Sequence, residues 1–292
     1  MAAPLIFGYS RAFSRNIGWV TEAEQARLRK ARIAIAGLGG VGGAHLLTLA
    51  RLGLANFNIS DFDTFDVHNL NRQAGAFMSC MGQPKLDTLA RMARDINPEI
   101  DLRLFPQGIK ADNIDDFLRN VDVYVDGLDF FALPARRMVF SKCREKAIPV
   151  LTAAPLGMGV ALLYFSPTGM SAENYFKWEG YDLQEQYARF IAGLSPAMVQ
   201  RDYLVAPEAV NFQEKRGPST VMACDMCAGV MGTSVLKLLL GRGVLRAAPW
   251  GIHFDAYHQV LKHTWRPFGN AHPLQQLLLK FIRPVLRGTS RV

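Results

Sequence analysis

Residues 33–54, IAIAGLGGVGGAHLLTLARLGL, combine a short apolar run, a cluster of glycines and a stretch with helical periodicity. Gly37, Gly39 and Gly42 form the pattern G-x-G-x-x-G, with Gly40 between them. In this arrangement a strand passes through a tight turn into a helix, and the missing side chains let backbone N–H groups and the helix N-terminus approach a phosphate. The stretch therefore predicts a nucleotide-binding turn rather than glycines that serve only close packing.

A carboxylate follows the second predicted strand. The run NFNISD, residues 56–61, ends at Asp61, which lies 19 residues after Gly42. An acidic residue at the tip of this strand can accept hydrogen bonds from ribose hydroxyls. The glycines and Asp61 together predict nucleotide binding, but they do not choose between a dinucleotide cofactor and ATP.

Strands and helices alternate along the chain. Predicted strands cover residues 32–36, 56–61, 101–107, 121–129 and 148–154, and predicted helices cover 16–30, 44–52, 85–97, 132–147 and 227–241. Thr21 and Glu24 fit a capping box near the start of the first helix. This alternation predicts an α/β fold with a Rossmann-like, doubly wound and mostly parallel sheet.

The sequence divides into four parts. They are an N-terminal arm and helix (1–30), a nucleotide-binding Rossmann-like domain (31–165), a crossover and substrate-facing segment (166–216), and a C-terminal part with a basic tail that completes the fold (217–292). Turn-forming and aromatic residues interrupt the periodicity of the third part. In the last part, residues 251–267 predict a hairpin. Residues 274–288 predict a core-capping or dimer helix broken near Pro284, in preference to a membrane-binding one.

Composition and charge restrict the classes of protein. Of the 292 residues, 50% are hydrophobic and 20% are charged, as in a globular chain with a substantial core. The net charge is +8, and residues 242–292 hold eight Lys or Arg against one acid, Asp255. Because the surplus is so local, it favours an acidic partner or a membrane surface near the C-terminus over nucleic-acid binding by the whole protein.

The sequence also bears on location. We find no leader pattern and no apolar stretch of about 18 residues that would span a membrane, and we expect a cytoplasmic protein. Four scattered cysteines, too few for a disulfide framework, fit reduced thiols.

A polar cluster follows Asp61. The runs DFDTFDVHNLNRQ (61–73) and GQPK (82–85) bring two cations and two amides close to the glycine turn in sequence: these runs contribute Asp63, Asn69, Arg72, Gln73 and Lys85. Guanidinium and ammonium groups suit a triphosphate, and a hydride-transfer enzyme has no use for so much positive charge there. Surface ion pairs with the neighbouring acids are the alternative.

The order G-x-G-G-x-G, D-x-D, N-L-x-R-Q, G-x-x-K and then an L-D pair resembles the ThiF/MoeB/HesA family of adenylating enzymes, relatives of the activating enzymes for ubiquitin-like proteins. The resemblance covers residues 8–165 and returns at 217–241. It implies a Rossmann-like, usually dimeric enzyme that uses ATP and Mg²⁺ to adenylate a carboxylate, often the C-terminal glycine of a small β-grasp protein.

The resemblance also implies roles for individual residues. It puts Gly37 to Gly42 on the phosphates, Asp61 on the ribose, and Asn69, Arg72, Gln73 and Lys85 along the triphosphate. Asp129 would hold the magnesium, and Asp126, three residues earlier, competes for that role or closes the strand. Adenylation is an in-line displacement by an anionic carboxylate, so these groups would position and neutralise rather than act as a strong base.

The N-terminal arm matches in part. AFSRNIG resembles the family segment R-Y-x-R-Q, whose second arginine reaches the other subunit's nucleotide. That residue would be Arg15, although Ala12 stands where the first arginine is expected. A solvent-facing Arg15 is the alternative. If the match holds, the active unit is a homodimer.

The cysteines depart from the family. Only one C-x-x-C pair is present, Cys224 and Cys227, where zinc-binding relatives carry two, so we expect no zinc and two buried thiols. Residues 144–223 contain no cysteine, and Cys143 lies in a predicted helix. We therefore expect adenylation without a thioester on this chain, with Cys224 and Cys227 the residues that would overturn it.

The acceptor stays open. It is a small ubiquitin-like or sulfur-carrier protein, a peptide or a small molecule. Two other functions also stay open: an NAD(P)-dependent oxidoreductase that uses the same glycine turn, and an inactive homologue that binds a partner protein. The intact set of polar residues argues against the last of these.

Overall fold

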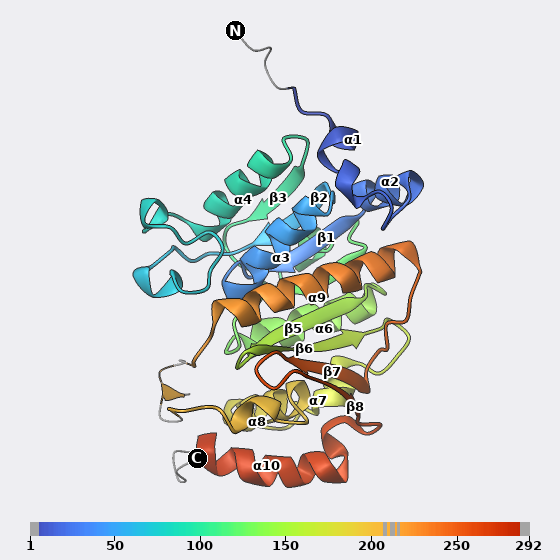
Figure 1. The fold of residues 1–292 in the computed structure, drawn as a ribbon. Coiled ribbons are helices and arrows are strands. Elements are labelled where there is room, and N and C mark those ends of the chain that lie inside the picture. The colour runs from blue at the N-terminus through green and yellow to red at the C-terminus, as the bar shows by residue number, and fades with distance from the viewer. Residues whose placement is uncertain (1–5, 207–208, 211–213, 215–216, 287–292) are drawn as a thin grey trace.

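An eight-stranded sheet runs through the molecule in the computed structural model, which describes residues 6–206, 209–210, 214 and 217–286 (Figure 1). The strands are β1 (Arg32–Ala36), β2 (Asn56–Ser60), β3 (Asp101–Phe105), β4 (Val123–Asp126), β5 (Val150–Leu156), β6 (Gly159–Phe165), β7 (Trp250–Asp255) and β8 (Val260–Trp265). Their order is β3-β2-β1-β4-β5-β6-β7-β8. β1 to β5 pair with one another in parallel, and β6, β7 and β8 continue the sheet from β5 by antiparallel pairing. The predicted fold class is confirmed.

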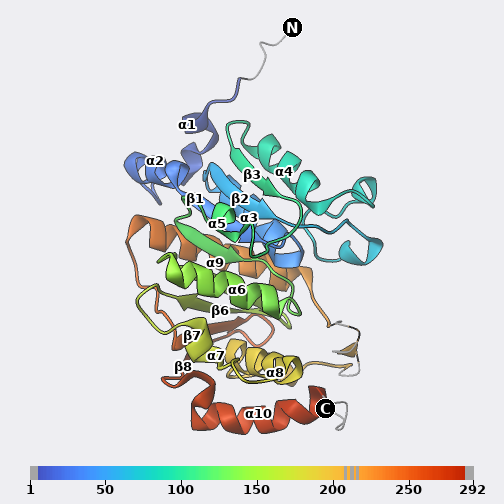
Figure 2. The same cartoon turned by 180° about the vertical axis from the view of Figure 1, so that it is seen from behind.

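Helices cover both faces of the sheet (Figures 1 and 2). They are α1 (Tyr9–Ala12), α2 (Glu22–Lys30), α3 (Gly40–Arg51), α4 (Lys85–Ile96), α5 (Ile114–Phe117), α6 (Leu133–Glu145), α7 (Ala172–Phe176), α8 (Leu183–Leu194), α9 (Val221–Leu240) and α10 (Pro273–Leu286). Short 3₁₀ helices are η1 (Ser14–Asn16), η2 (Val67–Asn69), η3 (Met78–Cys80), η4 (Val199–Arg201) and η6 (Gly269–Ala271).

The two faces have separate cores because side chains alternate along each strand. Ile33 and Ile35 of β1 enter the core under α3, α4 and α9, whereas Ala34 and Ala36 enter the core under α5, α6 and α7. β1 is buried along its whole length. A strand buried on both faces reads as a continuous apolar run, which is why the sequence predicts it clearly.

Several predicted elements are confirmed. β1 has the predicted bounds, Thr21 and Glu24 form the capping box of α2, and β7 pairs with β8 as the predicted hairpin. α3 begins at Gly40 rather than at residue 44. Glycine is a poor helix former, so a prediction from propensity starts the helix after the glycines.

Other elements were missed. β6 turns back on β5 at Gly157, whose φ is +59°, and neither it nor the helices α7 and α8 were predicted. N-cap side chains do mark both helices: Ser171 accepts from the Asn174 amide and Asp182 from the Glu185 amide. These caps are the signal that the sequence analysis overlooked.

Two expectations about the C-terminal helices were wrong. α10 runs to Leu286 with Pro284 inside it, so the proline does not end the helix where a break was expected. α9 is the one described helix that is long and apolar enough to span a membrane, although no such stretch was expected. Half of its most apolar window is buried, and it packs on α3 and on the sheet as a core helix does.

The strand order reverses beside β1. β2 lies on one side of β1 and β4 on the other, so the connections that leave their carboxyl ends diverge to opposite faces. In open α/β sheets, ligands bind at such a switch point, outside the carboxyl ends of the strands.

Candidate functional site

Three glycines meet at the carboxyl end of β1. Gly37 has φ +82°, and a Cβ on it would lie 2.4 Å from the carbonyl oxygen of Gly127. A Cβ on Gly42 would lie 1.8 Å from the Gly37 oxygen. Backbone contacts this close exclude any side chain. Gly127 was not among the predicted site residues, although a glycine directly after a buried strand is the signal for such packing.

The start of α3 presents its backbone amides. Gly39 is the N-cap residue and supplies no side-chain cap, so the first amides of α3 are left for a ligand. This helix N-terminus carries a partial positive charge that favours an anion. The glycine turn therefore has the geometry of a phosphate-binding turn.

Asp61 lies directly against the turn. Its carboxylate accepts hydrogen bonds from the backbone amides of Leu38 (2.6 Å) and Asp63 (2.8 Å). Burial raises the pKa of Asp61, and those two amides and the charge of Lys85 oppose the rise. Asp61 thus lies where its carboxylate could also accept a hydrogen bond from a ribose hydroxyl.

Lys85 begins α4 with a buried side chain. Its Nζ lies 3.2 Å from Oδ2 of Asp63, with 8% of the lysine side chain and 56% of the aspartate side chain exposed. The ion pair foreseen as the alternative is therefore present. Because the pair is open on the aspartate side, a phosphate could compete for the ammonium.

Arg72 and Gln73 approach the turn from the loop after β2. Cγ and Cδ of Arg72 lie 3.7 and 3.8 Å from the Cβ position of Gly40, and Nε2 of Gln73 lies 3.8 Å from that of Gly39. In the described part of the chain Arg72 has no carboxylate partner; Nη1 donates to the backbone of His68. Oε1 of Gln73 is buried without a hydrogen-bond partner among the described residues.

Asn69 has a different part in this loop. Its Oδ1 accepts from the Asp66 amide at 3.0 Å, and the Asp66 side chain accepts from the His68 amide, so the two residues cap η2 reciprocally. Asn69 is 2% exposed. In this conformation it shapes the loop that carries Arg72.

The two aspartates after β4 differ sharply. Asp126 is buried, and its Oδ2 accepts from Nε of Arg136 and from Oγ1 of Thr152, both at 2.8 Å. Asp129 is exposed; its Oδ1 accepts from the Phe131 amide at 2.9 Å, and it has no ion-pair partner among the described residues. Asp126 therefore closes the strand end, and Asp129 has a carboxylate oxygen to offer a cation.

A single carboxylate fits Mg²⁺, which is commonly held by one or two protein carboxylates together with substrate phosphates and water. No group of three or more His, Cys, Asp or Glu side chains gathers into a metal cluster within the described residues. Asp129 is thus the residue that would hold Mg²⁺ beside the triphosphate.

Arg15 does not join this site within its own chain. The neighbouring Asn16 donates to the Leu52 carbonyl, at the C-terminal end of α3, whereas the glycines begin α3. At about 1.5 Å per residue the 12-residue helix separates the two by roughly 17 Å. Arg15 is exposed.

All four cysteines are free and buried. Burial raises the pKa of the Cys143, Cys224 and Cys227 thiols, which disfavours the thiolate. Cys224 nevertheless lies at the site: its Sγ is 3.2 Å from the Cβ position of Gly40. From the sequence Cys224 was expected only as a buried thiol, so its contact with the glycine turn was not predicted.

Comparisons with known proteins identify the family. The sequence profile of the ThiF family matches residues 13–275. The chain is 32% identical over 153 residues to the tRNA threonylcarbamoyladenosine dehydratase of Haemophilus influenzae, a match that covers 52% of this chain and 58% of that protein. It is 30% identical over 223 residues to the probable adenylyltransferase/sulfurtransferase MoeZ of Mycobacterium tuberculosis, covering 75% of this chain and 50% of that one. The chain thus spans about half the length of these two relatives.

Solved structures share the fold. E. coli MccB with AMPCPP and MccA superposes with a TM-score of 0.67 at 17% identity, covering 89% of this chain and 72% of that one. E. coli tRNA N6-threonylcarbamoyladenosine dehydratase, TcdA, gives a TM-score of 0.58 at 19% identity, covering 80% of this chain and 95% of that one.

Proposed function

The chain belongs to the ThiF family, and from that premise we propose that it uses ATP to adenylate a carboxylate, with release of pyrophosphate. The observation that carries the proposal is the set of groups around the glycine turn: the open N-terminus of α3, Arg72, which no carboxylate among the described residues pairs with, and the buried ammonium of Lys85. These are donors for phosphate oxygens. A hydride-transfer site would also use the helix N-terminus for its dinucleotide, but it needs neither the arginine nor the lysine.

The chemistry follows from these groups. A carboxylate oxygen of the acceptor attacks the α-phosphorus, the bond to the bridging oxygen breaks, and pyrophosphate carries the negative charge away. Because the attacking group is already an anion, the protein has to align it and to neutralise the phosphates. Arg72, Lys85 and the amides of α3 do so, Asp61 holds the ribose, and Gln73 offers its amide to a phosphate.

Mg²⁺, held by Asp129, would supply further positive charge to the phosphates. The side chain of Asp129 is exposed, and no cationic side chain among the described residues pairs with it, which supports this assignment. Asp126 is excluded from the role because both Arg136 and Thr152 already bind its Oδ2.

The acceptor is proposed from the relatives. The sulfur carrier protein ThiS adenylyltransferase of E. coli is 26% identical over 188 residues, covering 64% of this chain and 74% of that one. MccB is seen with MccA. We therefore infer that the acceptor carboxylate belongs to a small carrier protein or to a peptide, ahead of a free small molecule. Residues 166–216 are the segment that would face it.

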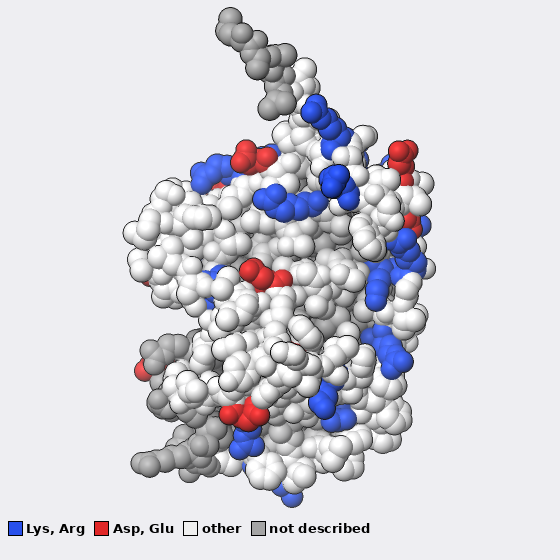
Figure 3. Space-filling model, in the orientation of Figure 1, with Lys and Arg blue, Asp and Glu red and all other residues white. Residues whose placement is uncertain are grey.

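We further propose a homodimer in which Arg15 reaches the partner's nucleotide. The arm carries exposed apolar side chains, Ile17 (42% exposed) and Trp19 (85% exposed), which suit burial against another subunit. The face seen in Figure 3 is largely uncharged in its middle, with Lys and Arg side chains mainly around it. If a second copy related by a two-fold axis packed on this face, the arm of each subunit would lie at the end where the glycine turn of the other subunit lies.

The four buried, free thiols support a reducing, cytoplasmic location.

Nucleotide choice provides the first test. Calorimetry with ATP and Mg²⁺, and separately with NAD⁺ and NADH, should show binding of ATP only. Exchange of labelled pyrophosphate into ATP should then depend on an added carrier protein or peptide. Arg72→Ala and Asp129→Ala should abolish exchange, while Asp112→Ala, a change at an exposed aspartate outside the site, should leave it intact. Tight NADH binding without ATP binding would make the oxidoreductase the correct assignment.

A further inference from the structure

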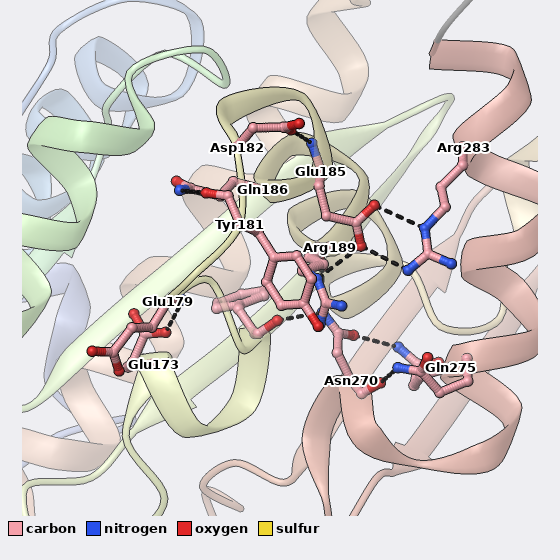
Figure 4. Close-up of polar contacts among 12 residues, drawn as sticks. Glu173, Glu179, Tyr181, Asp182, Glu185, Gln186, Arg189, Asn270, Gln275 and Arg283 are labelled. Carbon is pink, nitrogen blue, oxygen red and sulfur yellow. Dashed lines mark hydrogen bonds and ion pairs between the residues drawn. The ribbon is translucent and has the colours of Figure 1, made fainter.

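α8 lies between two other parts of the fold. On one face, the Glu185 carboxylate accepts from Nε and Nη2 of Arg283 on α10, at 2.8 and 2.7 Å, and lies 2.8 Å from Nε of Arg189 (Figure 4). Leu279 and Ile282 of α10 pack beside it. α8 is therefore fastened to the C-terminal helix, not suspended in a loop.

The opposite face of α8 contacts the loop that follows β4. Oη of Tyr187 donates to the carbonyl oxygen of Phe131 at 3.0 Å. The Tyr187 ring stacks on Phe130, with centroids 5.8 Å apart and planes at 29°, and meets Phe131 edge-on at 5.4 Å. Tyr187 is 8% exposed, so this contact is largely dry.

A second contact reaches the same loop through Arg136. The Phe190 ring of α8 covers the Arg136 guanidinium, with Cζ 4.6 Å from the ring centroid. That guanidinium donates to the carbonyl oxygens of Leu128 (2.6 Å) and Asp129 (3.2 Å) while it pairs with Asp126. The Arg136 guanidinium thus joins three consecutive segments, the end of β4, the loop after it and α6, and the Phe190 ring covers this guanidinium.

These contacts converge on one carboxylate. Oδ1 of Asp129 accepts from the amide of Phe131, and the carbonyl of the same Phe131 receives the Tyr187 hydroxyl. Phe131 is therefore held on both sides, by the aspartate and by α8. Since the backbone of Asp129 is also bound by Arg136, both its main chain and its side chain depend on partners that α8 contacts.

We propose that α8 sets the position of the Asp129 carboxylate, with Tyr187 as a positioning residue that acts through Phe131. The inference rests on the proposed function in one respect: the position of the Asp129 carboxylate matters because of the cation and triphosphate that it would face. Because α8 belongs to the segment that faces the acceptor, acceptor binding that shifts α8 would be transmitted to the metal-binding carboxylate.

The chain offers a matched control. Oη of Tyr175 on α7 also donates to a backbone carbonyl at 3.0 Å, that of Gly193 in the last turn of α8, so this bond holds α8 to α7 and not to the Asp129 loop. Tyr187→Phe and Tyr175→Phe each remove one hydroxyl and keep the ring. Each variant loses one hydrogen bond from a tyrosine hydroxyl to a backbone carbonyl. A difference between the two variants therefore reports where the lost bond lies, not a general loss of stability.

The first measurement needs no ligand. Hydrogen exchange of the amides of residues 128–132 should be roughly 2- to 10-fold faster in Tyr187→Phe than in Tyr175→Phe, the range that corresponds to one net hydrogen bond. The second measurement is the gain in ATP affinity that Mg²⁺ produces. It should fall in Tyr187→Phe, whereas affinity without Mg²⁺ stays unchanged in both variants.

Equal exchange in the two variants would overturn the proposal, whether or not the protein binds ATP. So would faster exchange in Tyr187→Phe with an undiminished effect of Mg²⁺. If the wild-type protein binds no ATP but the loop still exchanges faster in Tyr187→Phe, the positioning contact stands and the adenylation assignment fails.

Discussion

Asp126, the last residue of β4, and Asp129, three residues later, give the sharpest test of the site. Asp126→Asn keeps the shape of the side chain but removes its charge, which leaves the Arg136 guanidinium buried without its carboxylate; the side chains of this pair are 3% and 2% exposed. Removing one partner of a buried ion pair costs about 3–5 kcal/mol. Asparagine keeps an oxygen that can accept from Thr152, so we expect the lower end, about 3 kcal/mol of unfolding free energy.

Asp129→Asn should have the opposite profile. The side chain is exposed and its one described hydrogen bond, from the Phe131 amide to Oδ1, can be kept by an amide oxygen. Substitutions at such surface positions change stability by about 0.5 kcal/mol or less. The variant should therefore unfold like the wild type and lose the effect of Mg²⁺ on ATP affinity.

Urea unfolding followed by tryptophan fluorescence, together with calorimetric titration of ATP with and without Mg²⁺, measures both quantities. The reasoning is refuted if Asp129→Asn destabilises the protein as much as Asp126→Asn. It is equally refuted if Asp126→Asn folds with unchanged stability and it is this variant that loses the Mg²⁺ effect.

Other predictions follow from single residues. Gly42→Ala should abolish ATP binding, because its Cβ would lie 1.8 Å from the Gly37 oxygen, whereas Gly229→Ala, with open space in mid-helix, should stabilise the fold by about 1 kcal/mol in thermal or urea unfolding. Burial lowers the pKa of His45 from 6.5 to about 3, so the neutral form is favoured in the folded state. This stability is present above pH 6.5 and declines as the pH falls towards 3. From pH 7 to pH 5 the wild type should lose about 2 kcal/mol more unfolding free energy than His45→Leu in urea unfolding; a smaller loss remains in both because burial also lowers the pKa of His253. Arg283→Gln should expose α10 to limited proteolysis while ATP binding persists, since the two hydrogen bonds lost are those to Glu185 on α8.

Local signals sufficed for much of the fold. Apolar periodicity and glycines predict the glycine turn, β1 and the helix that starts at Lys85. Both signals lie within the segment itself and need no distant partner. α8 has a local signal only in its N-cap, Asp182; its ion pair and apolar contacts come from α10, about 90 residues later. Propensity alone does not report such contacts.

The site divides in the same way. Its residue types were evident from sequence, but the distinct roles of Asp126 and Asp129 were not, because they depend on Arg136, which returns to the strand end only after the chain enters α6. The contact of Cys224 with Gly40 joins segments more than 180 residues apart. Roles set by long-range partners could not be predicted from the spacing of residues.

The packing of α9 on α3 has a consequence for synthesis of the protein. Leu46 and Leu49 of α3 belong to a core that Met231 and Val235 of α9 complete, so about 170 residues must be translated after α3 before its outer face is covered. During that interval the nascent chain carries an open apolar surface beside a half-built sheet, a state prone to aggregation. On the ribosome, therefore, the core behind the glycine turn is completed late, and truncated chains that end before α9 should require chaperones.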